Sequence, residues 1–158
     1  MAGQDSAFHA ELAADRDALL AIVSGIDDKS LALETRNAGW AVRDVLAHVI
    51  AVDTELIATL EAAVDEGSRV NERSMEEYES EIARWVAATA SVLVQELQAR
   101  GERWRGLLSK VPASGLDEAA GVWWTKGTLR DILASWRDHD KQHSEDVRLS
   151  LEQRSALK

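Results

Sequence analysis

The sequence predicts an all-α protein folded as a four-helix bundle. Proline occurs once in 158 residues, and alternating runs of β-branched residues, which are typical of strands, are almost absent. Alanine, leucine, glutamate and arginine, all good helix formers, dominate the chain. Four segments carry apolar residues at spacings of three and four, so each has one face to bury against the others.

The first two helices are expected over about residues 5–24 and 41–65. Leucine and valine side chains recur at helical spacing in both segments. Gly25 and Gly67 follow them, and glycine is the usual residue just beyond a helix C-terminus. The apolar face of the second helix also includes His48.

The third helix is expected over residues 74–110. Ser74 and Glu77 form a capping-box pattern, in which each side chain satisfies a free backbone amide of the other residue. Pro112 follows the segment and cannot continue a helix. The segment exceeds the others in length and contains Gly101, so a kink or break is expected near that glycine.

The fourth helix is expected to begin after Thr128 and to end near Leu151. Thr128 and Asp131 form a shorter version of the capping box. No low-complexity linker or internal repeat divides the chain, so residues 5–152 are interpreted as a single bundle domain. Residues 153–158 are expected to be a frayed tail.

Composition excludes several classes of function. The chain has no cysteine, which rules out disulfides, a protein thiol nucleophile and thiolate ligands to a metal. Its net charge is −10 and it has no cluster of lysine and arginine, so neither a nucleic acid nor an anionic membrane surface is an expected partner. No membrane-spanning stretch or secretory leader is recognised, and the expected location is cytoplasmic.

Three of the four histidines are candidate metal ligands. His139 and His143 lie four residues apart on the apolar face of the last helix, and His48 lies on the apolar face of the second. Residues spaced by four share one side of a helix, about 6 Å apart, so two imidazoles can converge on one ion. Three imidazoles that leave open positions are typical of a catalytic site for Zn, Ni or Fe. The alternative is that the histidines merely pack, and His9 is expected to be an exposed surface residue.

The carboxylates near these histidines are weaker candidates for a metal ligand or a catalytic base. Asp140 stands where the zincin motif needs a glutamate and is displaced about 100° around the helix from His139, so it is interpreted as solvated or as a partner behind the ligands. Asp53 and Glu55 follow His48 within two turns. Either could accept a proton or bind metal, but ordinary surface carboxylates are the preferred interpretation.

The six tryptophans divide into two groups of three. Three lie within helices and are expected to anchor the core: Trp85, Trp104 and Trp136. Three lie at or next to helix starts, where they could line a pocket mouth or simply pack: Trp40, Trp123 and Trp124. Arg43 and Lys126 could hold an anionic substrate there, although ordinary surface charges are the preferred interpretation.

Two segments of the chain resemble the DinB-like superfamily. NAGWAVRDVLAHVIAVD is similar to the family segment in which a tryptophan precedes the second helix and a histidine follows. KGTLRDILASWRDHDKQHSEDV resembles the last family helix with its HxxxH pair. The order of features matches from about residue 5 to 152. The resemblance implies a four-helix bundle, often a homodimer, with a divalent metal held by His48, His139 and His143.

The resemblance also narrows the expected function. Family members include transferases and isomerases that use bacillithiol, mycothiol or glutathione, and others are described as metal-dependent hydrolases. The mycothiol-dependent maleylpyruvate isomerase branch is similar but has an acidic ligand where this chain has His139. The expected function is therefore a thiol-dependent S-transferase or detoxification enzyme acting on a small electrophile. A hydrolase, a non-catalytic metal- or small-molecule-binding stress protein, and a purely structural bundle stay as alternatives.

Overall fold

Four long helices make up most of the protein in a computed structural model, which describes residues 2–65, 73–122 and 124–157. They are α1 (Ala2–Val23), α2 (Val42–Val64), α4 (Ala90–Leu108) and α5 (Leu129–Ala156). The shorter elements are α3 (Met75–Val86), the 3-10 helices Ser30–Ala32 and Ala113–Asp117, and the strands β1 (Ala119–Val122) and β2 (Thr125–Thr128). The prediction of an all-α four-helix bundle is confirmed.

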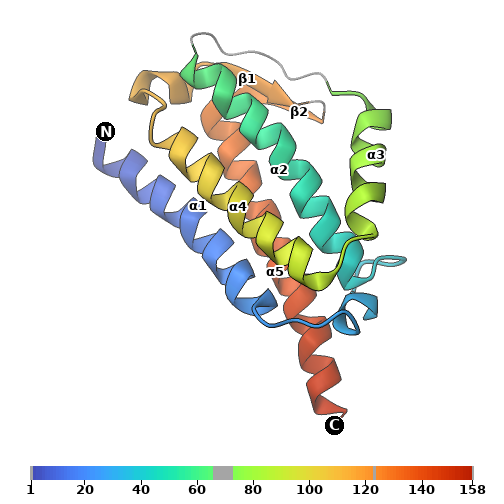
Figure 1. The fold of residues 1–158 in the computed structure, drawn as a ribbon. Coiled ribbons are helices and arrows are strands. Elements are labelled where there is room, and N and C mark those ends of the chain that lie inside the picture. Colours follow the sequence, from blue (N-terminus) through green and yellow to red (C-terminus); the bar gives the residue numbers. More distant parts are fainter. Residues whose placement is uncertain (1, 66–72, 123, 158) are drawn as a thin grey trace.

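The four long helices form a closed ring of contacts. Helix α1 packs against α4 and α5, and α2 packs against the same two helices (Figure 1). Helix α3 lies outside this ring along α2, and the β1–β2 hairpin packs against α5 and α2. No helix in the described parts of the chain is long and apolar enough to cross a membrane.

The bundle interior consists of two apolar clusters with polar side chains between them. One cluster includes Trp104 and Trp136, and the other includes Trp85, so all three tryptophans expected in the core are buried there. Along α1, the buried Arg16 lies between Leu12 of the first cluster and Leu19 of the second. This polar layer crosses the middle of the bundle and contains Arg16 and the three candidate metal ligands.

The predicted third helix is divided, but not at Gly101. It consists of α3 and α4, which are separated at residues 87–89, whereas Gly101 lies inside α4. The side chain of Thr89 caps α4, and the carboxylate of Asp28 accepts a hydrogen bond of 2.7 Å from the backbone amide of Ala90. Because Asp28 is distant in sequence, this stop signal was not recognisable from the segment itself. Both predicted capping boxes, at Ser74 and Thr128, are confirmed.

Two further details differ from the prediction. Residues 111–128, between the predicted third and fourth helices, contain the β1–β2 hairpin, in which Ala119 pairs with Thr128 and Val122 with Thr125. Helix α5 continues to Ala156, and Arg154 in its last turns forms an ion pair with Asp27 at 3.0 Å. The glycine predicted to end the second helix, Gly67, lies outside the described residues.

Candidate metal centre

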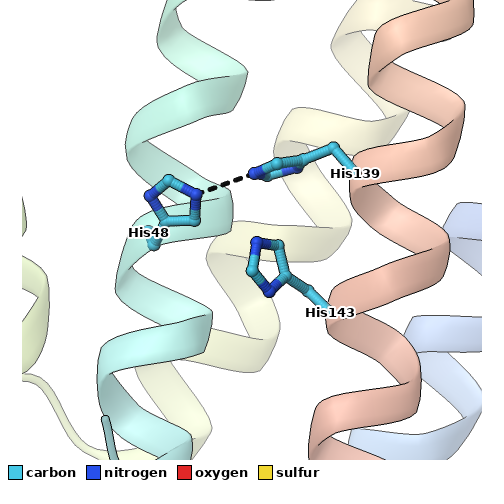
Figure 2. Close-up of side chains that lie close together, drawn as sticks. All are labelled: His48, His139 and His143. Atoms are coloured by element: carbon cyan, nitrogen blue, oxygen red, sulfur yellow. Dashed lines mark hydrogen bonds between the residues drawn. The ribbon is translucent and has the colours of Figure 1, made fainter. Parts of the chain in front are cut away.

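Helices α2 and α5 bring three histidines to one point in the polar layer. The α2 N-terminus is fixed by Asp44, whose carboxylate accepts a hydrogen bond of 2.8 Å from the amide of Ala41. His48 lies about a turn and a half further along α2, and α5 presents His139 and His143 on the facing side (Figure 2). The three rings point toward one another across the gap between the helices.

The distances between these rings fit a shared ligand. One nitrogen from each of His48, His139 and His143 can be chosen so that all lie within 4.8 Å of one another. The Nε2 atoms of His48 and His139 are 2.8 Å apart. Two lone pairs at that distance repel, so a proton or a cation is needed between them. The geometry therefore brings together all three predicted ligands.

The outward-facing ring nitrogens have different partners. The Nδ1 atom of His48 is hydrogen-bonded to the hydroxyl of Tyr78 on α3. The Nδ1 atom of His143 lies 3.0 Å from a carboxylate oxygen of Asp146. The Nδ1 atom of His139 is buried and has no hydrogen-bond partner among the described residues. In metal sites such outward partners orient the ring and direct its other nitrogen at the ion.

Burial favours the neutral, metal-binding form of two of these rings, His48 and His143. Desolvation, with the neighbouring imidazoles His139 and His143, lowers the pKa of His48 to about 3. Desolvation and His139 likewise lower the pKa of His143, although Asp146 opposes the change. Desolvation raises the pKa of Tyr78 to about 12, so its hydroxyl stays protonated at neutral pH. A donor set of three imidazoles fits a divalent ion such as Zn, Ni or Fe.

A small cavity adjoins the histidines. Its volume is about 230 Å³, and the described residues that line it are His48, Val52, Tyr78, Trp124 and His139. This is below the roughly 300–1,000 Å³ of pockets for drug-sized ligands. A larger hollow of about 440 Å³ lies between α1 and α4, but no histidine lines it. The cavity beside the histidines therefore suits a small, mostly apolar group.

The interpretation of Asp53 as a surface carboxylate is wrong, and of the two alternatives for Asp140 the solvated one is wrong. Both are buried, and both bind the guanidinium of Arg16, which is fully buried too. Arg16 donates five hydrogen bonds, two to each carboxylate and one to the carbonyl of Leu97. The charge and hydrogen bonds of Arg16 outweigh burial and lower the pKa of Asp140, whereas burial raises the pKa of Asp53. Sequence reasoning missed Arg16, although an arginine within the apolar stripe of the first helix was a visible signal.

Two other expectations need correction. Glu55 is also buried rather than on the surface, and Arg73 forms an ion pair with it at 3.2 Å. Glu81 of α3 binds the same arginine, so this network attaches α3 to α2. His9 is half-buried rather than exposed, and its Nε2 atom is buried without a hydrogen-bond partner among the described residues.

The expected tryptophan lining is found in part. The ring of Trp40 is stacked on His143, with centroids 6.2 Å apart and planes inclined by 18°. Trp124 lines the cavity and is 39% exposed, as expected for a pocket mouth. Trp123 lies outside the described residues. Arg43 and Lys126 are not among the described residues that line the cavity.

Residues 12–140 match the family model described as the mycothiol maleylpyruvate isomerase N-terminal domain. A comparison with curated proteins gives no match. Solved structures share the fold, among them an isomerase and a probable hydrolase. The mycothiol-dependent maleylpyruvate isomerase superposes with a TM-score of 0.82 at 13% identity, over 90% of this chain and 60% of its own. This chain thus spans about three-fifths of that enzyme's length.

The second solved structure has a length similar to that of this chain. It is YfiT from Bacillus subtilis, a probable metal-dependent hydrolase with an unusual four-helix bundle topology. Its TM-score is 0.79 at 20% identity, and the match covers 98% of this chain and 90% of YfiT. At these identities both likenesses show the fold, which is the DinB-like bundle predicted from the sequence.

Proposed function

The chain belongs to the mycothiol maleylpyruvate isomerase N-terminal domain family, and we propose that it is a metal-dependent enzyme acting on a small molecule. The observation that carries the proposal is the group of His48, His139 and His143, whose candidate ligand atoms lie within 4.8 Å of one another beside a cavity. Three protein ligands leave a coordination position open, as catalytic sites require and structural sites do not. When bound, a divalent ion supplies the Lewis acidity that activates a nucleophile.

The residues around the cavity limit what can bind there. Val52 and Trp124 present apolar surface, which excludes water and favours an apolar substrate group. Tyr78 keeps its phenolic proton, because its pKa is raised to about 12, so it can act as a hydrogen-bond donor and not as a base. The cationic residues considered for an anionic substrate are not among the lining residues described. We therefore propose a small, mostly uncharged electrophile as the substrate.

A low-molecular-weight thiol is the proposed co-substrate. The chain has no cysteine, so sulfur chemistry at this site needs a thiol from outside the protein. The name of the family and of one structural relative refers to mycothiol. With about 230 Å³ available, only the sulfur-bearing end of such a molecule would enter the cavity. The proposed reaction is addition of the thiol to the electrophile, in which the S–H bond breaks, a carbon–sulfur bond forms and the adduct takes up the proton. Reversal of such an addition would release an isomer of the substrate.

Metal-dependent hydrolysis is the second candidate. The match to YfiT, which covers 98% of this chain and 90% of that protein, favours it. Hydrolysis would use the same three histidines, with water in place of the thiol. The two reactions therefore differ in the co-substrate and not in the site.

The test is turnover by metal-loaded protein against a panel of electrophiles, with and without mycothiol, bacillithiol and glutathione. We expect thiol-dependent turnover by the wild type and its loss in His139→Ala, with Arg103→Ala as the control. Arg103 lies on the surface in an exposed ion pair with Glu61, away from the histidines. Turnover of esters or amides without any thiol would favour the hydrolase. Equal turnover by His139→Ala and the wild type would contradict both, and stoichiometric binding without product would indicate a non-catalytic binder.

A further inference from the structure

A buried carboxylate stands behind one of the three histidines. Asp146 lies three residues after His143 on α5, and its side chain is fully buried. Its Oδ2 atom is 3.0 Å from the Nδ1 atom of His143. The two oxygens of Asp146 accept hydrogen bonds from Arg36 and Asn37, so the carboxylate also faces His143 as an acceptor. Nδ1 of His143 therefore carries the hydrogen, and Nε2 keeps its lone pair.

The same carboxylate is held from the other side by a loop before α2. Residues 34–41, here called the 34–41 loop, form a tight turn in which Glu34 and Ala41 make an antiparallel bridge and Gly39 has a φ of +82°. Asn37 donates a hydrogen bond of 2.6 Å to Oδ2 of Asp146, and Arg36 donates one to Oδ1. The acceptor oxygens of Asp146 thus have fixed partners from the loop as well as from His143.

Two more contacts attach the 34–41 loop to this point of the molecule. The hydroxyl of Ser150, one turn after Asp146 on α5, donates a hydrogen bond of 2.8 Å to the carbonyl of Glu34. Trp40 of the loop stacks on His143 and meets His48 edge-on, with centroids 5.1 Å apart and planes inclined by 64°. The loop therefore contacts the His143 ring directly through Trp40 and indirectly through Asp146.

His143 differs in this respect from the other two candidate ligands. His48 has the neutral hydroxyl of Tyr78 behind it, which can donate or accept and so does not fix the tautomer. Behind His139, the nearest oxygen of Asp140 is 3.9 Å from Nδ1, and both Asp140 oxygens accept hydrogen bonds from Arg16. Within the part of the chain that the structure describes, His143 alone has a carboxylate hydrogen-bonded to its outward nitrogen.

We infer that Asp146, held by Arg36 and Asn37 of the 34–41 loop, is a positioning residue that fixes His143 as the Nδ1–H tautomer with Nε2 directed at the metal. The inference rests on the proposed metal site. The 34–41 loop, which connects two helices, thereby fixes the orientation of His143. Removal of such outer partners typically weakens metal binding 10–100-fold.

The first measurement is the tautomer of His143 in metal-free protein, from nitrogen–proton correlation NMR of the imidazoles. We expect Nδ1–H in the wild type. Asp146→Asn keeps the shape of the side chain, but its amide can donate to Nδ1, so we expect the Nε2–H tautomer to become populated. Arg36→Ala and Asn37→Ala, in which Asp146 loses one of its anchors, should show partial changes in the same direction. Arg36 is half-exposed, so its truncation leaves the core unchanged.

The second measurement is zinc affinity by competition with a chromophoric chelator. We expect a 10–100-fold rise in Kd for Asp146→Asn and a smaller rise for Arg36→Ala. Arg103→Ala is the matched control, because it removes an exposed arginine of a different carboxylate pair. Wild-type tautomer and wild-type affinity in Asp146→Asn would overturn the inference. If the wild type binds no metal, the proposed function fails, while the tautomer measurement still decides the role of Asp146.

Discussion

Two polar clusters, one buried and one partly buried, lie side by side in the middle layer of the bundle, and they differ in how fully their hydrogen bonds are satisfied. In the Arg16 cluster, the guanidinium donates five hydrogen bonds to Asp53, Asp140 and one carbonyl, which accounts for every N–H that it has. In the histidine cluster, the Nε2 atoms of His48 and His139 face each other at 2.8 Å, and Nδ1 of His139 has no partner among the described residues.

This difference separates a structural role from a ligand-binding one. A buried charge is tolerated when all of its hydrogen bonds are made. In the Arg16 cluster every N–H group of the guanidinium is used, so none is available to a ligand. The histidine cluster has converging nitrogens with spare lone pairs and a cavity beside it. His139 and Asp140 are adjacent in sequence, so one helix turn of α5 supplies a side chain to each cluster. We therefore expect substitutions in the first cluster to affect folding and those in the second to affect metal binding.

The largest effect is expected for Arg16→Met. The substitution keeps much of the side-chain volume but leaves Asp53 and Asp140 buried without a cation, which typically costs about 3–5 kcal/mol. Chemical denaturation followed by circular dichroism measures the loss in the free energy of unfolding. A change within about 0.5 kcal/mol, as surface substitutions give, would contradict a structural role for the cluster.

Metal binding should give the next largest effect. A ligand that binds only the folded state stabilises it by about 2.7 kcal/mol at a concentration 100 times its Kd. We expect zinc to raise the denaturation midpoint of the wild type, a chelator to reverse the effect, and His48→Ala to abolish it. An equal rise in His48→Ala would show that zinc binds elsewhere, and the comparison between the two clusters would fail.

The smallest effect concerns two glycines of α4. A Cβ atom at Gly101 would lie 3.2 Å from Cγ of Arg16, whereas nothing lies within 4 Å of one at Gly106. Gly106→Ala should therefore stabilise the protein by about 0.5–1 kcal/mol through helix propensity. At Gly101 the same gain is offset, because the arginine is fixed by its five hydrogen bonds and cannot move aside. Equal rises in the unfolding temperature of Gly101→Ala and Gly106→Ala would show that the Arg16 side chain can move aside, and is not fixed by its hydrogen bonds.

The sequence was enough to predict the fold class and to identify the three candidate metal ligands. Helical spacing identified four amphipathic segments, and the two capping boxes located helix starts that the structure confirms. The buried-face positions of His48, His139 and His143 were enough to expect convergence, because neighbouring helices of a bundle face one another. These features follow from the spacing of residues within one helix, which can be read directly from the sequence.

The features that were missed depend on contacts between distant residues. The break before α4 needs Asp28, which binds the amide of Ala90 from 62 positions away. The burial of Asp53 and Asp140 needs Arg16, and the burial of Asp146 needs Arg36 and Asn37 of the 34–41 loop. A carboxylate on a helix is predicted to be exposed, because the sequence does not show which distant arginine pairs with it. Paired buried charges are therefore the part of this site that periodicity could not reveal.

The metal content of protein purified without an affinity tag tests the central claim most directly. Mass spectrometry of the wild type should give about one equivalent of a divalent transition metal, as three converging imidazoles require. His48→Ala, with its fold checked by circular dichroism, should contain none, and Arg103→Ala should match the wild type. Wild-type protein that carries no metal, and takes up none when offered zinc, nickel or iron, would contradict the claim that the histidine cluster is a metal centre.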